Sequence, residues 1–206
     1  MRVTAYRNRS RIAVIKTFQI LFLAACLLPL TAMSMPIYTD SLQLTVKMPP
    51  LDQLENQDRA DQIRKLIDYI QKTFRINRNK AVAIITEAVY NGLKHDLQPE
   101  LILAIIAVES SYQEKAVSHA GARGLMQIMP KAHPEKIEAI GGVRALFNPK
   151  KNISTGTKIL NEYLARTGNL NKALLRYNGS LNHPDSPYLK KVWGIYNKLK
   201  KVANLS

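Results

Sequence analysis

An all-α fold is predicted by three observations on the sequence. Apolar residues recur at helical spacings of three and four from residue 58 onward. Proline marks a helix start in "LQPE" and glycine marks a helix end in "ARTG". Stretches of alternating polar and apolar residues, which are typical of strands, are nearly absent. We therefore expect six to eight helices, with a small β excursion in the loop "SHAGARG" at residues 118–124.

Composition and charge limit the classes to which the chain can belong. Its 206 residues, 46% of them hydrophobic, are enough for one domain with a sizeable core. A single cysteine, Cys26, excludes an internal disulfide, and the four histidines show no metal-ligand spacing, so no metal ion or other cofactor is expected. The net charge of +15 favours a polyanionic partner, and nucleic acid, anionic lipid and anionic cell wall meet that condition equally.

The first 34 residues have the pattern of an export signal. A basic stretch, "MRVTAYRNRSRIAVIK", precedes an apolar stretch and then small residues. Ala32 and Ser34 suit signal-peptide cleavage, whereas "LAAC", which ends at Cys26, is also similar to a lipoprotein box, whose cysteine is lipidated and attaches the protein to a membrane. An uncleaved anchor is disfavoured because the apolar run is short and contains Pro29. The segment predicts export to the periplasm and leaves both forms of processing open.

The rest of the chain divides into three predicted parts. Residues 35–57 contain two adjacent prolines and weak periodicity, which predicts a linker. Residues 58–96 form a helical segment that we expect to pack on the domain that follows, residues 97–206. The predicted apolar stripes of the helical segment are Ile63, Leu66, Ile67 and Ile70, and then Val82, Ile85, Val89 and Leu93.

Helix boundaries are well marked in the C-terminal domain. Pro99 begins a helix that runs to about Ser110 and is apolar nearly all round, which predicts a buried central helix. Residues 148–168 begin with Asn-Pro and end with Gly, so they form a second capped helix, and Asn152 within it is interpreted as a helix-end cap rather than a ligand. Two more helices are expected at residues 170–177 and 188–202.

The last of these helices is amphipathic and basic. Lysines lie opposite an apolar face, and a helix of this kind can bind a membrane surface. More often such a helix packs its apolar face on its own domain, and we predict that outcome. The residues of the apolar face are Leu189, Val192, Ile195, Tyr196, Leu199 and Val202.

Glu109 is the sharpest chemical feature of the sequence. It ends the apolar run "LILAIIAV", and a carboxyl group among apolar side chains has a raised pKa because burial disfavours the charged form. A glutamic acid that stays protonated near neutral pH can donate a proton to a leaving group, as cleavage of a glycosidic bond requires. A glutamate on an exposed helix end would be inert, and a lone acid does not decide between these readings.

The stretches around Glu109 favour a binding cleft. The two glycines of "SHAGARG" allow the backbone to turn tightly and approach a ligand. Gln127 and Met129 follow at once and offer an amide and a flexible apolar wall. Tyr177 and Asn178 end a predicted helix just before a glycine, and their flat ring and paired donors and acceptors suit a sugar.

Four stretches occur in the order and spacing of a known family. They are "ES" at 109–110, "AVSHAGARGLMQIMP", "NPKKNISTGT" and "ALLRYNGS". From about Gln98 to Val202 the chain resembles the catalytic domain of the soluble lytic transglycosylases, which is similar in fold to goose-type lysozyme. The resemblance implies a lysozyme-like lytic transglycosylase domain, preceded here by the signal segment, the linker and the N-terminal helices.

The resemblance implies a role for each residue that matches the family pattern. Glu109 matches the catalytic acid/base, and Tyr177 matches the tyrosine that faces the acid. Asn178 matches the neighbour of that tyrosine. Ser118 matches a serine near the carboxyl group, with a simple turn cap as the alternative.

Two further matches and two departures concern the glycan cleft. Gln127 and Met129 match residues that line the cleft, with a core position as the alternative for Met129. The family usually has alanine before the Tyr-Asn pair, where this chain has Arg176. The segment "LNHPD" that follows is short and lacks a glutamate found in some larger members. The departures put substrate contacts on that side of the cleft in doubt more than the chemistry.

The implied reaction cuts peptidoglycan between N-acetylmuramic acid and N-acetylglucosamine. Glu109 would protonate the glycosidic oxygen and then, as a carboxylate, remove the proton from the 6-hydroxyl of the same sugar, which closes a 1,6-anhydro ring. This scheme needs no second carboxylate and no cofactor. Glu114 and Glu162 are the nearest alternatives in the later motifs, and we interpret both as solvated.

Three other functions are compatible with parts of the sequence. A hydrolytic muramidase on the same fold would position a water molecule, and a peptidoglycan-binding scaffold would have little activity. Nucleic-acid binding is disfavoured because the chain has an export signal and no recognised nucleic-acid motif. Small members of the resembling family often open the wall for a secretion or conjugation apparatus, and the sequence leaves that role open.

Overall fold

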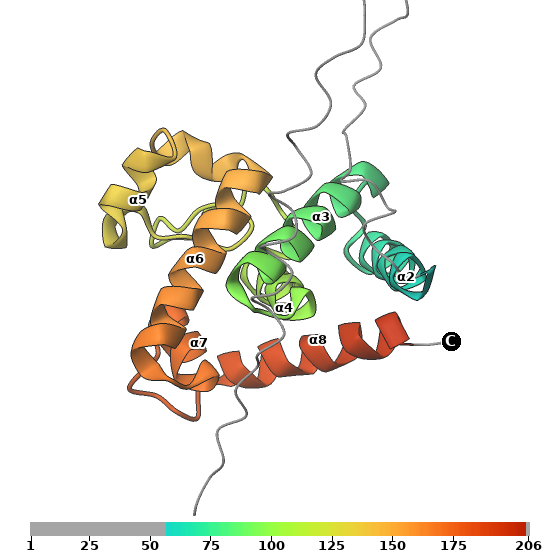
Figure 1. Ribbon diagram of the computed structural model, residues 1–206. Coiled ribbons are helices and arrows are strands. Elements are labelled where there is room, and N and C mark those ends of the chain that lie inside the picture. Colours follow the sequence, from blue (N-terminus) through green and yellow to red (C-terminus); the bar gives the residue numbers. More distant parts are fainter. Residues whose placement is uncertain (1–56, 205–206) are drawn as a thin grey trace, which may run out of the picture. The chain divides into compact units, whose positions relative to one another are not determined.

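The structure of the protein is a computed structural model that describes residues 57–204 (Figure 1). The predicted export signal, Cys26 and all but the last residue of the predicted linker lie outside the described residues. The α-helices are α2 (Gln57–Phe74), α3 (Arg78–His95), α4 (Pro99–Ser110), α5 (Pro134–Ala139), α6 (Pro149–Thr167), α7 (Leu170–Asn178) and α8 (Pro187–Asn204). Two 3-10 helices, η2 (Pro130–Ala132) and η3 (Val143–Phe147), precede and follow α5.

The all-α prediction is confirmed over these residues. They contain no strand, and the small β excursion expected near residues 118–124 consists of isolated bridges that pair Arg123 with Val117 and with Ile128. The predicted helix ends are correct because local chemistry fixes them. The Asn148 side chain accepts a hydrogen bond from the backbone N–H of Lys151, and Gly168 closes the same helix in the left-handed conformation.

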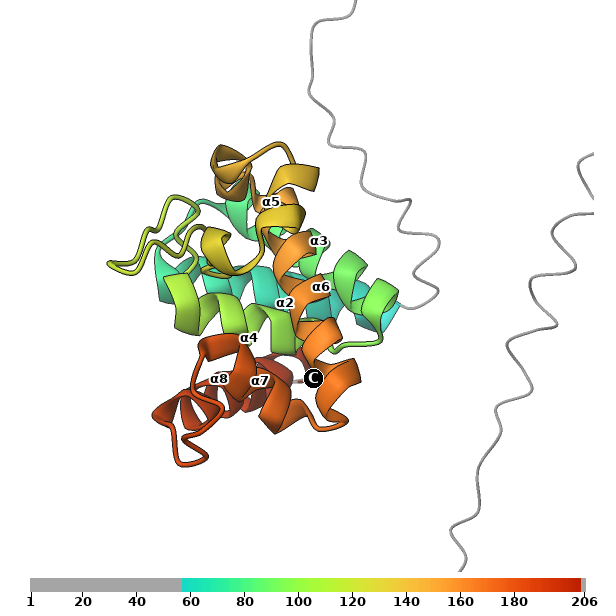
Figure 2. The same ribbon diagram turned by 90° about the vertical axis from the view of Figure 1, so that its left-hand side faces the viewer.

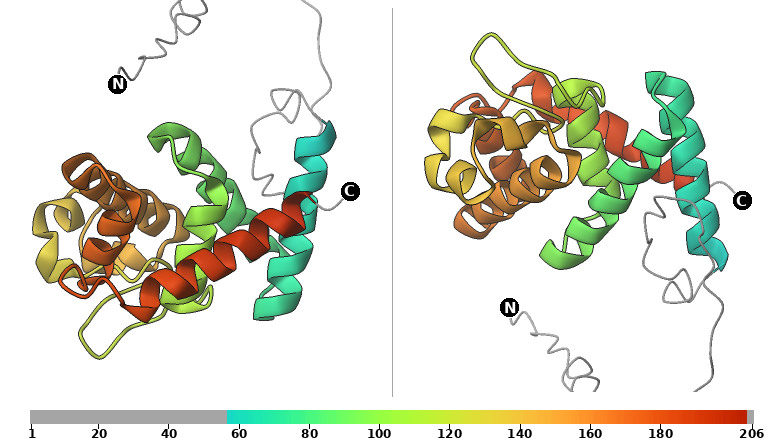
Figure 3. Two further views of the ribbon diagram at one scale, coloured as in Figure 1. Left: turned by 90° about the horizontal axis from the view of Figure 1, so that it is seen from below. Right: turned by 90° about the horizontal axis from the view of Figure 1, so that it is seen from above.

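The central helix is α4. Every residue from Leu101 to Ala107 is buried, and none is more than 5% exposed. Helices α3 and α8 pack against it, and Figure 3 shows α8 crossing α4 and continuing to α2. This burial confirms the predicted central helix, and it places Glu109 at the end of the most enclosed element of the fold.

The predicted apolar stripe of α3 is correct except at its end, since Ile85 is buried and Val82 and Val89 pack against the core. Leu93 is 66% exposed, so its assignment to the apolar face is wrong. The buried stripe runs instead through Ala88 to Gly92, where a β-carbon would come within 2.6 Å of the Leu97 carbonyl oxygen. The small residues bring the chain close to the start of α4, and the larger Leu93 is left on the outer side.

The N-terminal helices share one core with the rest of the described chain. Helix α2 packs against α3 and α8, and the rings of Phe74 and Tyr112 lie 4.5 Å apart between centroids. The apolar face of α8 is packed on the domain, as predicted, with Val192 and Leu199 fully buried. No helix within residues 57–204 combines the length and the apolar character that a membrane span requires.

Candidate active site

The backbone turns sharply directly after Glu109. Ser111 and Tyr112 both adopt positive φ angles, 49° and 64°, which non-glycine residues rarely do. The Tyr112 side chain holds this turn, because its ring is buried and its hydroxyl donates to the Leu103 carbonyl oxygen at 3.0 Å. The turn ends α4 within two residues of Glu109 and fixes where its carboxyl group lies.

The Glu109 carboxyl group is largely enclosed, and among residues 57–204 its hydrogen-bond donor is Tyr188. The Tyr188 hydroxyl donates to Oε1 at 2.8 Å. Burial raises the pKa of Glu109 from the ordinary 4.5 to about 7, while the Tyr188 hydrogen bond opposes that rise. No other carboxylate of the described residues is among the causes of this shift. The group can therefore exist as an acid or as a base near neutral pH.

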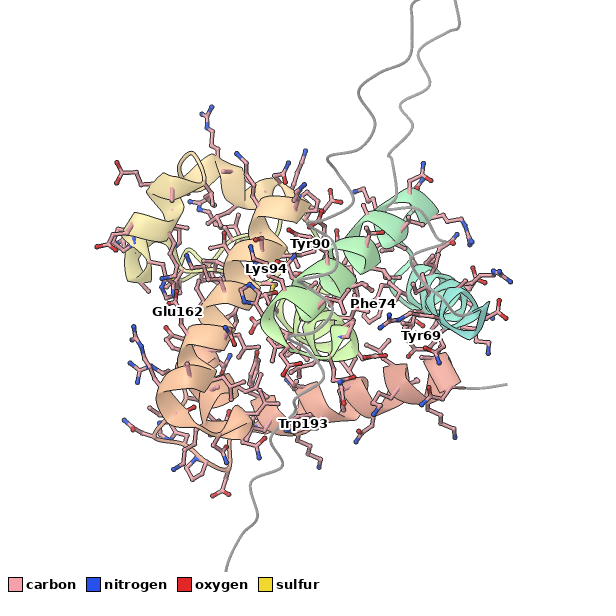
Figure 4. The ribbon with its side chains drawn as sticks, in the orientation of Figure 1. Tyr69, Phe74, Tyr90, Lys94, Glu162 and Trp193 are labelled. Carbon is pink, nitrogen blue, oxygen red and sulfur yellow. The ribbon has the colours of Figure 1, made fainter. Side chains whose placement is uncertain are left out.

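Tyr177 lies beside the same carboxyl group. Its hydroxyl donates to the Met126 carbonyl oxygen at 2.8 Å, so it connects α7 to the loop that precedes η2. Burial raises the pKa of Tyr177 well above the ordinary value, and the nearby charge of Glu109 adds to the rise. Helix α7 is also tied to α8, because the Trp193 indole N–H donates to the Asn171 side chain at 2.8 Å; Figure 4 labels Trp193 on α8.

The loop before η2 is a tight hairpin. The backbone groups of Arg123 and Ile128 exchange two hydrogen bonds, and the four residues between them make the turn. Gly124 has a φ of 76°, and a β-carbon there would collide with the Asn152 side chain and the Leu146 carbonyl oxygen. The sequence therefore places glycine where two other segments touch the turn.

Gln127 is held inside this turn. Its φ is 46°, and its Nε2 donates to the carbonyl oxygens of Ala116 and Gly124, at 3.2 and 2.8 Å. These bonds use the amide N–H groups to brace the loop. The side-chain oxygen and the partly exposed face of Gln127 are what a ligand can contact.

Asn152 clamps the hairpin from α6. Its Oδ1 accepts from the Met126 backbone N–H at 2.8 Å, and its Nδ2 donates to the carbonyl oxygens of Arg123 and Leu146, at 3.0 and 2.8 Å. The interpretation of Asn152 as a helix-end cap is wrong, because Asn148 caps the helix and Asn152 is fully buried one turn later. Its role is to satisfy two buried backbone groups and one half-buried group.

The other predicted site residues have local partners. The Ser118 hydroxyl accepts from the Ala122 N–H at 3.0 Å, which is the turn-cap arrangement, and the structure shows no hydrogen bond between Ser118 and Glu109. Met129 is partly exposed and immediately precedes η2. Asn178 is exposed at the end of α7, where its Oδ1 accepts from the Ser180 hydroxyl at 3.2 Å.

The two alternative acids are paired rather than simply solvated. Glu114 lies 3.5 Å from the Lys80 ammonium group, and Glu162 lies 2.9 Å from that of Lys136. Both carboxylates remain partly exposed, with 19% and 32% of their side chains accessible. Over residues 57–204, no three His, Cys, Asp or Glu side chains are grouped so that they could hold a metal ion.

Tyr188 is a site residue that was not predicted from the sequence. It was placed only at the start of the last helix, and 79 positions separate it from Glu109. No local pattern marks it, because the contact arises when α8 docks across α4. The signal available in the sequence was an aromatic residue in the first turn of a lysine-rich helix, and the structure shows that this residue is buried.

The raised pKa of Glu109 predicts a pH-dependent stability. The folded protein holds this proton more tightly than the unfolded chain, so the contribution is complete below about pH 4.5 and is lost as the pH rises through about 7. The loss corresponds to about 3 kcal/mol of unfolding free energy. In urea unfolding at pH 5 and pH 8, Glu109→Gln should lack this part of the decline. Equal declines in both proteins would contradict the assignment of the pKa.

The sequence is similar to a protein family and to several known proteins. Residues 88–191 match the family model described as "Transglycosylase SLT domain". A "Transglycosylase" of Enterobacteria phage PRD1 is 34% identical over 105 residues, which cover 51% of this chain and 35% of that protein. A "Membrane-bound lytic murein transglycosylase C" of Actinobacillus succinogenes is 37% identical over 121 residues, covering 54% and 32%. The same-named protein of Actinobacillus pleuropneumoniae serotype 5b is 42% identical over 81 residues, covering 34% and 22%.

These matches cover only part of each relative. The chain spans only about a fifth to a third of the length of these relatives. The family match covers half of the chain, includes every predicted site residue, and begins inside α3, ahead of the boundary that we predicted at residue 97. An all-α domain, an enclosed acid at the end of its central helix and this match together identify the chain as a member of the SLT transglycosylase family.

Proposed function

We propose that the protein is a peptidoglycan lytic transglycosylase that uses Glu109 as its acid/base. The observation that carries the proposal is an enclosed carboxyl group with a pKa of about 7, held by Tyr188 beside Tyr177, in a chain of this family. The relatives' names, which include "lytic murein transglycosylase", support the same reaction. The substrate would be the bond between N-acetylmuramic acid and N-acetylglucosamine in a glycan strand.

Glu109 would act in two successive steps. Protonated, it gives its proton to the glycosidic oxygen as the bond to the anomeric carbon breaks, and the muramic acid ring carries the developing positive charge. The carboxylate that remains then takes the proton of the 6-hydroxyl, whose oxygen bonds to the anomeric carbon. The products are a free 4-hydroxyl on N-acetylglucosamine and a 1,6-anhydro end on N-acetylmuramic acid, and Glu109 is protonated again.

Two tyrosines would support these steps. Tyr188 donates to the carboxyl oxygen and so favours the charged form that exists between the steps. Tyr177 bonds to the Met126 carbonyl and so fixes the hairpin next to the acid. An intramolecular nucleophile makes a second carboxylate unnecessary, which agrees with a Glu109 pKa that is raised by burial and not by another acid.

The products decide between this proposal and its rivals. Purified protein would be incubated with peptidoglycan, and the soluble fragments would be analysed by mass spectrometry. Anhydro-muropeptides are the expected result. Fragments with a free reducing end would instead make the protein a muramidase, and retained binding without any fragments would make it a wall-binding scaffold.

Tyr188→Phe should shift the pH dependence of the reaction. Wild-type activity should fall as the pH rises above about 7, because the acid loses its proton. The Tyr188 hydrogen bond lowers the pKa of Glu109, so its removal should move this fall to higher pH. Initial rates between pH 5 and 9 would measure the shift, with Tyr196→Phe on the same helix as the control. An unchanged or lower pH for the fall would contradict the role given to Tyr188.

The location of the reaction is also a proposal. The export pattern of the first 34 residues and the words "membrane-bound" in the relatives' names support action at the cell envelope, in the periplasm. Attachment through a lipidated Cys26 would place the enzyme on the membrane. A role in opening the wall for a secretion or conjugation apparatus would need only local activity of this kind.

A further inference from the structure

Arg176 is a cation without an anionic partner next to the candidate site. It directly precedes Tyr177 on α7, is exposed, and forms no ion pair with any carboxylate of residues 57–204. Its guanidinium group lies over the ring of Tyr163, 5.1 Å from the ring centroid. A cation–π contact of this kind restricts the side chain, and Arg176 remains exposed.

The Tyr163 ring connects Arg176 to the site. Tyr163 is close enough to Tyr177 to contribute to the raised pKa of that residue, and Tyr177 is similarly affected by Glu109. On its other side, the Tyr163 ring lies 6.3 Å from the ring of His133, between η2 and α5. In Figure 2, α6 extends from the level of α5 to that of α7, so the helix that carries Tyr163 spans the distance between the elements that flank His133 and Arg176.

Few carboxylates of the described residues compete for the Arg176 guanidinium group. The neighbouring acid on α6, Glu162, is neutralised by Lys136 at 2.9 Å, and Figure 4 labels it on the side of α6 toward α5. From residue 151 to the end of the sequence there are ten lysines and arginines but only two acids. A carboxylate that reaches Arg176 therefore meets an exposed guanidinium group, and few acids of this part of the chain compete with it.

We propose that Arg176 binds a carboxylate of the substituent on N-acetylmuramic acid and makes the enzyme select strands that carry it. The inference rests on the proposed function, since it assumes a glycan strand along Tyr177 and Tyr163. The carboxylate has two sources, the peptide attached to the lactyl group and the lactyl group itself after the peptide has been removed. Neutral glycans have neither.

Binding measurements would separate these sources without requiring cleavage. The protein carrying Glu109→Gln would be titrated with peptide-bearing strands, with strands whose peptides have been removed by an amidase, and with chitin oligosaccharides. Arg176→Met keeps an apolar side chain on Tyr163 and removes the charge. Lys158→Met removes one exposed charge from the side of α6 near His95, and serves as the control for net charge.

Arg176→Met should weaken binding of peptide-bearing strands about fivefold, as expected for an exposed ion pair. Loss with the peptide-bearing strands alone assigns the peptide carboxylate, loss with the amidase-treated strands alone assigns the freed lactyl carboxylate, and loss with both shows that Arg176 binds either one. Arg176→Lys should recover part of the affinity. An effect equal to that of Lys158→Met, or an equal loss with chitin oligosaccharides, would overturn the inference. Arg176-dependent binding by a protein that cleaves nothing would leave it standing while the proposed function fails.

Discussion

Glu109→Gln is expected to lower the release of anhydro-muropeptides from purified peptidoglycan by about a thousandfold. Glutamine has nearly the same shape as glutamic acid, but it can neither donate the proton to the glycosidic oxygen nor accept the proton of the 6-hydroxyl. Loss of a general acid/base commonly costs a factor of about 100 to 10,000. Initial rates of soluble product formation, followed by mass spectrometry at pH 6, would measure the effect.

A matched control is available five positions later in the chain. Glu114 is also a glutamate, but its partner is Lys80, so Glu114→Gln should retain close to the wild-type rate. Unfolding does not explain a loss in Glu109→Gln, because at pH 6 Glu109 is mostly protonated and a neutral glutamine should leave the fold about equally stable. If Glu109→Gln kept more than about a tenth of the activity, another group would have to supply the proton.

Asn152→Ala is expected to lower the unfolding free energy by about 3 to 5 kcal/mol. The substitution removes three hydrogen bonds and leaves the Met126 N–H and the Leu146 carbonyl group without those partners among fully buried residues. Each buried polar group left without a partner costs about 1 to 3 kcal/mol. Urea unfolding monitored by circular dichroism would measure the loss, and the slope of the transition should be unchanged.

Asn148→Ala provides the comparison, four residues earlier on the same helix. Asn148 is an exposed N-cap that accepts from the Lys151 N–H at 3.1 Å, so its loss should cost about 1 kcal/mol. The prediction fails if the two variants are destabilised equally, since Asn152 would then contribute no more than a cap does. Asn152→Ala should also lower activity more than Asn148→Ala, because of these two residues Asn152 is the one that contacts the hairpin.

Much of the fold could be predicted because its helix ends are encoded locally. Pro99 and the Asn148-Pro149 pair start helices where the structure has them, and Gly168 ends one. The inner face of α3 was harder to predict, because beside its large apolar residues it contains Ala81, Ala88 and Gly92, whose small size lets a neighbouring segment approach closely. A pattern of large apolar residues does not record that property, so Leu93 was placed on the wrong side.

The candidate site was predictable only in part, for a related reason. Glu109 follows an apolar run along one helix, so its enclosure can be inferred from adjacent residues. The hydrogen bond from Tyr188 depends on how α8 crosses α4, and the clamp by Asn152 depends on how α6 meets the hairpin. Contacts between segments that are distant in sequence leave no periodic signal in either segment.

Helix α6 carries both the clamp of the hairpin and the platform for Arg176, and this has a consequence for where strands are cut. Asn152 and Tyr163 are eleven residues apart on one continuous helix, a distance of about 16 Å along its axis. A helix does not change length when a ligand binds. Helix α6 therefore keeps a constant distance between the hairpin that Asn152 holds and the proposed carboxylate contact at Arg176. Cleavage would then fall at a constant number of sugars from the muramyl substituent that Arg176 binds.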